Sequence, residues 1–236
     1  MVPAEGIDIA LSLDISSSMT TSRLGQKQTR LEATKEVIRG FIRGRANDRI
    51  GFVAFARDGV ALSPPTLDYA ALDRIVKDTD SGIVPDGTSI GIGLATALNM
   101  LRDSTAASRI VILLTDGQHN TPTISPKDAS ELAAALKIKV YTIGVLTDAR
   151  LQVQTEIDEK LLRSIAERTG GKYFAADSAE SLAAVYEEIG SLETSSVGRE
   201  HFERFTELAP WFVLPAAALL LAELLLGATY LRRAPA

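Results

Sequence analysis

The chain has 236 residues, of which 23% are charged and 46% are hydrophobic, and its formal net charge is −5. This length suits one domain with a modest extension, and the lack of a basic surplus argues against a nucleic-acid partner. With no cysteine and two histidines, the sequence excludes disulfides, thiol nucleophiles, iron–sulfur clusters and an ordinary zinc site of sulfur and imidazole ligands.

The first part of the chain alternates two hydrophobic periodicities. Apolar runs with strand character occupy residues 7–13, 49–56, 109–115 and 139–146. Between them, apolar residues recur every three or four positions and predict helices; these residues are Leu31, Val37, Ile38, Phe41, Ile42, Leu94, Leu98, Leu101, Leu132, Leu136, Leu161, Leu162 and Ile165. The alternation of strands and helices predicts an α/β domain with a doubly wound, mostly parallel sheet.

Local signals refine this arrangement. Thr29 and Glu32 have the spacing of a capping box and predict the start of a helix. Asp58-Gly59 lies between two strand-like pieces and predicts a tight hairpin, so one antiparallel edge strand is expected in the sheet. A last helix near residues 178–192 is expected to close a domain that covers residues 5–192.

The C-terminal part has a different composition. We expect a polar stalk at residues 193–208, followed by about twenty mostly apolar residues, at 209–231, which are enough to cross a bilayer as one helix. The short tail 232–236 contains two arginines, which favour a cytoplasmic C-terminus and an extracytoplasmic domain. Glu223 lies within the apolar segment, where an ionisable group usually faces a protein partner rather than lipid.

The N-terminal residues 1–9 have neither a charged region nor an apolar region of the kind found in signal peptides. Two topologies therefore stay open. Either the chain is part of a longer protein with membrane segments upstream, or it is tail-anchored with its domain in the cytoplasm.

Two aspartates end apolar strands of the predicted sheet. Asp14 follows the first strand and Asp116 follows the most apolar one, so both carboxylates are expected at the carboxyl rim, where α/β sheets bind ligands. Two close carboxylates repel each other, and a divalent cation removes that repulsion. Ser16 and Ser18 alternate in the loop after Asp14 and would add hydroxyl ligands. Without metal, Asp116→Ala is predicted to stabilise the domain slightly.

The segment from Asp14 to Ser18, with Thr88 and Asp116, resembles the metal-ion-dependent adhesion site, or MIDAS, of von Willebrand factor type A domains. The resemblance covers roughly residues 7–192. It implies that Asp14, Ser16, Ser18, Thr88 and Asp116 bind Mg²⁺ or Mn²⁺, directly or through water. It also implies that one coordination position is left for an aspartate or glutamate of a protein partner.

Longer stretches, among them residues 5–19, 85–101, 157–189 and 207–226, resemble the bacterial Bat (aerotolerance) membrane proteins, especially BatA. This resemblance implies a bacterial inner-membrane protein whose A domain faces the periplasm. It also implies that other Bat proteins and a MoxR-type AAA+ ATPase are partners. Members of that group usually carry membrane helices before the A domain, and this sequence departs from them there.

Other interpretations of the same residues stay open. Asp14 and the serines could form a strand-ending turn, and Thr88 could cap a helix. Asp14 could also be the nucleophile of a Mg²⁺-dependent aspartyl-phosphate phosphatase, although Ser16 stands where such enzymes have a second aspartate. A serine hydrolase lacks its Gly-x-Ser-x-Gly elbow. A structural membrane scaffold with a vestigial metal site is the third alternative. His119, beside the proposed site, could tune partner choice or simply be solvated.

The sequence therefore predicts a membrane-anchored, Mg²⁺-dependent protein-binding module that is not an enzyme. It is expected to help assemble or regulate a bacterial envelope complex.

Overall fold

A computed structural model describes residues 6–21, 23–24, 28–117, 119–121, 123–146, 158–200, 219–221 and 224. The chain divides into two units, Met1–Arg199 and Glu200–Ala236. The predicted membrane-spanning segment lies outside the described residues except for 219–221 and 224. Of the helices within the described ranges, none combines the length and the apolar character needed to cross a bilayer.

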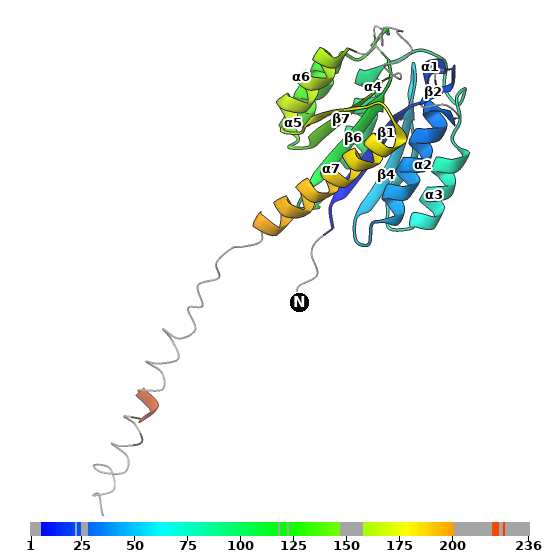
Figure 1. The fold of residues 1–236 in the computed structure, drawn as a ribbon. Coiled ribbons are helices and arrows are strands. Elements are labelled where there is room, and N and C mark those ends of the chain that lie inside the picture. The colour runs from blue at the N-terminus through cyan, green and yellow to red at the C-terminus, as the bar shows by residue number, and fades with distance from the viewer. Residues whose placement is uncertain are drawn as a thin grey trace, which may run out of the picture. The chain divides into compact units, whose positions relative to one another are not determined.

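The first unit is built on a six-stranded sheet (Figure 1). The strand order is β5-β4-β1-β6-β7-β8, and only β4 and β5 run antiparallel to each other. The strands are β1 (Asp8–Asp14), β4 (Arg49–Phe55), β5 (Gly59–Thr66), β6 (Arg109–Thr115), β7 (Lys139–Val145) and β8 (Tyr173–Ala176). The prediction of a mostly parallel sheet with one antiparallel edge strand is confirmed.

Helices cover both faces of this sheet, as Figure 1 shows. The helices are α1 (Ser17–Thr21), α2 (Arg30–Arg43), α3 (Tyr69–Asp78), α4 (Ile90–Leu101), α5 (Pro126–Ala135), α6 (Glu159–Thr169) and α7 (Ala179–Glu200). Buried side chains of α2, α3 and α7 form one apolar cluster, and those of α4, α5 and α6 form the other. Strand β1 alternates between them, because Ile9 and Leu11 join the first cluster and Ala10 joins the second.

Several elements were not expected from the pattern. Helix α3 and the edge strand β8 belong to the fold, and a short antiparallel pair, β2 (Arg23–Leu24) with β3 (Gln28–Thr29), precedes α2. Helix α7 runs to Glu200, past the expected end at residue 192. Glu193 continues the helix with its side chain buried, because Lys139 and Tyr141 on β7 bind its carboxylate. The stalk and its boundaries stay predictions.

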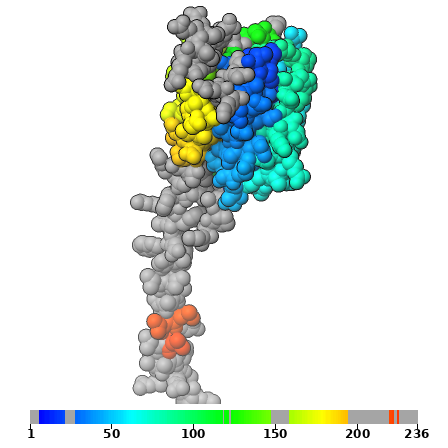
Figure 2. All heavy atoms as spheres, turned by 45° about the vertical axis from the view of Figure 1, so that its right-hand side comes forward, coloured from blue at the N-terminus to red at the C-terminus, as the bar shows by residue number. Residues whose placement is uncertain are grey.

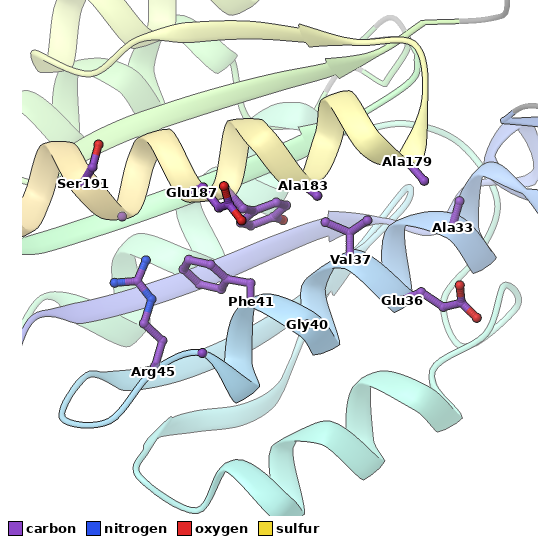
Figure 3. A pocket seen from close by; sticks show the side chains of 13 residues that line it. Ala33, Glu36, Val37, Gly40, Phe41, Arg45, Ala179, Ala183, Glu187 and Ser191 are labelled. Atoms are coloured by element: carbon purple, nitrogen blue, oxygen red, sulfur yellow. The ribbon is translucent and has the colours of Figure 1, made fainter.

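Helices α2 and α7 lie side by side on one face, and Figure 2 shows α2 (blue) between α7 (yellow) and α3 (cyan). A groove of about 910 Å³ separates α2 from α7 (Figure 3). Small residues keep it open, among them Ala33 and Gly40 on α2 and Ala183 on α7. Phe41 and Tyr186 also line the groove, and their ring centroids are 4.9 Å apart.

Candidate metal site

The site begins at the C-terminal end of β1. From β1 the chain continues to β4 on one side of the sheet, whereas from β6 it continues to β7 on the other side. The carboxyl ends of β1 and β6 are therefore the place where such a sheet is expected to bind a ligand. Asp14, the last residue of β1, is fully buried. One of its carboxylate oxygens accepts a hydrogen bond from the Ser16 backbone N–H at 2.9 Å, and the other accepts one from the Thr115 hydroxyl at 2.6 Å. The carboxylate is therefore fixed in orientation from the loop after its own strand and from the neighbouring strand β6.

The serines after β1 connect Asp14 to the next strand of the sheet. The Ser16 and Ser18 hydroxyls are 3.1 Å apart, and the Ser18 hydroxyl donates to Asp116 Oδ1 at 2.6 Å. Ser17 points elsewhere: its backbone N–H and hydroxyl donate to the Asp86 carboxylate at 2.9 and 2.8 Å. The alternation expected from the sequence holds, because Ser16 and Ser18 face one another while Ser17 fixes the loop to its neighbour.

Thr88 comes from the loop before α4 and is also buried. Its backbone N–H donates to the Asn120 side chain at 2.9 Å, and the Asn120 backbone N–H donates to the Thr88 carbonyl at 3.0 Å. The preceding Gly87 has φ +133°, which a residue with a Cβ rarely adopts. A Cβ added at Gly117 would lie 3.3 Å from the Thr88 hydroxyl oxygen, so Thr88 lies directly beside the residue that follows Asp116.

The structure thus gathers all five sequence-predicted residues at one rim of the sheet. A chain of hydrogen bonds links Asp14, Ser16, Ser18 and Asp116. Thr88 lies beside Gly117, the residue after Asp116. Within the described residues, no group of three or more His, Cys, Asp or Glu side chains could hold a metal ion. The predicted site is not a group of this kind, because it has only two carboxylates and its other three predicted ligands are serine and threonine hydroxyls.

The electrostatics of the site fit a hard cation. Burial and, next, the Asp116 charge raise the pKa of Asp14 to about 7, against the hydrogen bonds from Ser16 and Thr115. Ionising both carboxylates is therefore unfavourable unless positive charge is supplied. All five predicted ligands offer oxygen, which suits Mg²⁺ or Mn²⁺. The donor set fits the predicted metal, and metal ligation by these five residues stays a prediction.

Sequence reasoning missed several residues of this region. Arg30, the first residue of α2, pairs with Asp116 through Nη1 and Oδ2, and both side chains are almost entirely inaccessible to solvent. Thr115 directly precedes Asp116, and Asp86 lies two residues before Thr88, so their spacing to predicted ligands could have identified them. Asn120 and Arg30 carry no such signal.

His119 and Glu223, which the sequence analysis singled out, have no assigned role. Burial lowers the pKa of His119, which favours its neutral form, and an influence on partner choice stays a prediction. Glu223 lies outside the described residues.

Comparison with known proteins identifies the family. Residues 8–188 match the family model of the von Willebrand factor type A domain. An uncharacterised protein of Borreliella burgdorferi is 34% identical over 186 residues, which cover 73% of this chain and 54% of that protein. The chain thus spans about half the length of that relative.

Two solved structures have the same fold. BatB from Bacteroides thetaiotaomicron is 27% identical with a TM-score of 0.67, and the match covers 80% of this chain and 98% of that one. An aerotolerance-related membrane protein from Bacteroides fragilis is 24% identical with a TM-score of 0.68, covering 78% and 98%. The predicted similarity to Bat proteins is confirmed, with BatB among the similar structures. By its sequence and its fold, the chain belongs to the von Willebrand factor type A domain family.

Proposed function

We propose that this chain is a membrane-anchored binding module, not an enzyme, that captures a carboxylate of a protein partner through Mg²⁺ or Mn²⁺. The metal would be held by Asp14, Ser16, Ser18, Thr88 and Asp116. The observation that carries the proposal is the convergence of these oxygen-bearing side chains at the point where the strand order reverses. When bound, the cation supplies a coordination position for an aspartate or glutamate of the partner.

The residue two positions after Asp14 supports binding over catalysis. An aspartyl-phosphate phosphatase is expected to have a second aspartate there, and this chain has Ser16, whose hydroxyl lies 3.1 Å from that of Ser18. This difference favours the binding module over the aspartyl-phosphate phosphatase.

The similarity to the Bat proteins supports a proposal about the cellular setting. We infer that the segment 209–231 anchors the chain in the bacterial inner membrane, with its domain on the extracytoplasmic side. The module would help assemble or regulate an envelope complex with other Bat proteins and a MoxR-type AAA+ ATPase. Protease protection in spheroplasts tests the topology: external protease should digest the domain, and a protected domain would overturn this orientation.

Affinity capture from solubilised bacterial membranes tests the binding role. The full chain serves as bait in Mg²⁺, in EDTA, and as the variants Asp14→Ala and Ser16→Ala in Mg²⁺. We expect one set of proteins that requires both metal and Asp14, with a smaller loss for Ser16→Ala because both carboxylates and the other two hydroxyls remain.

The matched control is Asp73→Ala. It also removes a carboxylate, but Asp73 pairs with Arg39 between α2 and α3 and lies outside the site. Circular dichroism checks that each variant is folded. Equal capture by the wild type and Asp14→Ala would contradict the proposal and direct attention to a structural or catalytic role.

A further inference from the structure

Arg30 places a permanent positive charge inside the predicted metal site. Its guanidinium Nη1 donates to Asp116 Oδ2, while Asp116 Oδ1 accepts from the Ser18 hydroxyl. The exposed fractions of the Arg30 and Asp116 side chains are 4% and 0%. This ion pair is therefore shielded from water and salt, which would otherwise weaken its effect.

The local fold fixes Arg30 in this place. Thr29 caps α2 through a complete capping box: its hydroxyl accepts from the Glu32 N–H at 3.1 Å, and Glu32 accepts from the Thr29 N–H at 2.9 Å. Thr29 also pairs with Arg23 in the β2–β3 ladder. Arg30 follows directly as the first helical residue, so the hairpin and the cap together hold its backbone at the rim.

The charge of the site can be followed through its binding states. Ionised Asp14 and Asp116 with Arg30 give one net negative charge. A divalent cation changes this to one net positive charge, and a partner carboxylate then brings it to zero. Without Arg30, the metal alone would neutralise the two carboxylates, and a partner carboxylate would add an uncompensated negative charge. The charges of the exposed Asp86 and of its neighbour Arg57 are common to all these states and do not alter the comparison.

Accepting the proposed function as its basis, we propose that Arg30 couples the two binding events of the site. It opposes capture of the metal alone by repelling the cation, and it leaves the loaded site with a positive charge that an acidic partner group neutralises. Arginine suits this role because its guanidinium keeps its charge and holds a carboxylate in a fixed geometry.

Mn²⁺ titration of the purified full chain, without any partner, tests this proposal. Bound metal is measured by calorimetry and free Mn²⁺ by electron paramagnetic resonance. Arg30→Gln removes the charge and should bind Mn²⁺ about tenfold more tightly than the wild type or better. Arg30→Lys keeps the charge and should stay within about threefold of the wild type, since its charge acts on the metal in the same way.

The matched control is Arg39→Gln, the same substitution on the same helix, at an arginine that pairs with Asp73 instead. It should leave the Mn²⁺ affinity unchanged. Equal or weaker Mn²⁺ binding by Arg30→Gln would overturn the role of Arg30.

A second titration compares sodium acetate with sodium chloride at equal ionic strength, using acetate as a simple carboxylate probe. Acetate should strengthen Mn²⁺ binding by the wild type more than binding by Arg30→Gln. An equal effect on both proteins would contradict the coupling.

Asp14→Ala separates this inference from the proposed function. If the wild type takes up Mn²⁺ and Asp14→Ala does not, the metal site stands, and the Arg30 variants alone decide the inference. If Asp14→Ala binds as the wild type does, or if no variant binds, the proposed metal site itself fails. If Arg30→Gln is unfolded without metal, saturating Mn²⁺ should restore its fold because the cation replaces the lost charge; a chain that stays unfolded overturns the inference.

Discussion

Strand β1 carries an aspartate at each end, and the two are held in opposite ways. At its start, the buried Asp8 receives two hydrogen bonds from Arg49, at 2.7 and 2.5 Å, and one from Ser104 at 2.5 Å. At its end, Asp14 accepts hydrogen bonds from Ser16 and from the Thr115 hydroxyl, and these donors are neutral. The charge of Asp8 is matched by Arg49, whereas at the other end Arg30 pairs with Asp116 and the donors to Asp14 carry no charge.

This difference separates carboxylates that hold the fold together from those that we propose bind a ligand. Glu193 belongs to the first kind, because Lys139 at 2.9 Å, Tyr141 at 2.5 Å and Ser108 at 2.8 Å all bind it. Both kinds are equally buried, so burial alone does not tell them apart. The two kinds differ in the number and the charge of the groups that bind each carboxylate.

The largest effect on stability is expected at Glu193, a buried carboxylate whose charge is matched by Lys139. Glu193→Ala removes a buried carboxylate and leaves the Tyr141 and Ser108 hydroxyls and the Lys139 ammonium without it, so the free energy of unfolding should fall by about 3 kcal/mol. Urea unfolding followed by circular dichroism measures this. Glu193→Gln should recover part of the loss by keeping hydrogen bonds, and a wild-type midpoint for Glu193→Ala would contradict the structural assignment.

At the rim, the two aspartates should respond differently when no metal is present. Asp116→Asn leaves the Arg30 charge buried without its carboxylate and should cost about 2 kcal/mol. Asp14→Asn removes a buried charge that faces another carboxylate, so it should be neutral or stabilising by about 1 kcal/mol. Thermal melts in EDTA compare the two variants, and the reverse order would contradict the charge assignment. Because of Arg30, the stabilisation expected from sequence for Asp116→Ala changes sign.

Acidification should also lower the free energy of unfolding by protonating Glu193, and this effect should be smaller than that of Glu193→Ala. Burial raises the pKa of Glu193, but hydrogen bonds from Tyr141, Lys139 and Ser108 and the Lys139 charge outweigh burial and hold it below its usual range. The ionised form therefore stabilises the fold at pH values above the ordinary glutamate pKa. This stabilisation is lost as pH falls through the lowered value. Urea midpoints in this acidic range should fall less in Glu193→Gln than in the wild type, and parallel curves would rule out this contribution.

The smallest effect is expected where an ion pair is exposed. Lys127 and Glu131 are 3.9 Å apart, with side chains that are 68% and 53% exposed. Lys127→Ala should change the free energy of unfolding by no more than about 0.5 kcal/mol, because water already solvates both charges. A larger loss in the same urea assay would show that charge pairing alone, without burial, accounts for the effects above.

The central strands could be predicted because burial on both faces makes them continuous apolar runs. Strands β1, β4, β6 and β7 have that composition, and the β4–β5 hairpin is marked by Asp58-Gly59. The edge strand β8 has four residues, too few for a clear pattern. Helix α3 has an apolar stripe at Leu72, Ile75 and Val76 that could have been recognised.

The site was predictable to the extent that its residues end strands or follow a family spacing. Asp14 and Asp116 met both criteria. Arg30 met neither, because an arginine at the start of a helix is ordinarily solvated and can face Asp116 only once α2 lies beside the rim. Its position depends on contacts between residues 86 positions apart in the sequence, which local patterns do not encode.

The anchoring of Glu193 also has a mechanical consequence. Helix α7 is the last element of the first unit, so any tension on the chain beyond Glu200 enters the domain along this helix. Glu193 joins the helix to Ser108, just before β6, and to Lys139 and Tyr141 on β7. Tension would therefore load these two strands in shear through a buried carboxylate before it reached the apolar contacts nearer the start of α7.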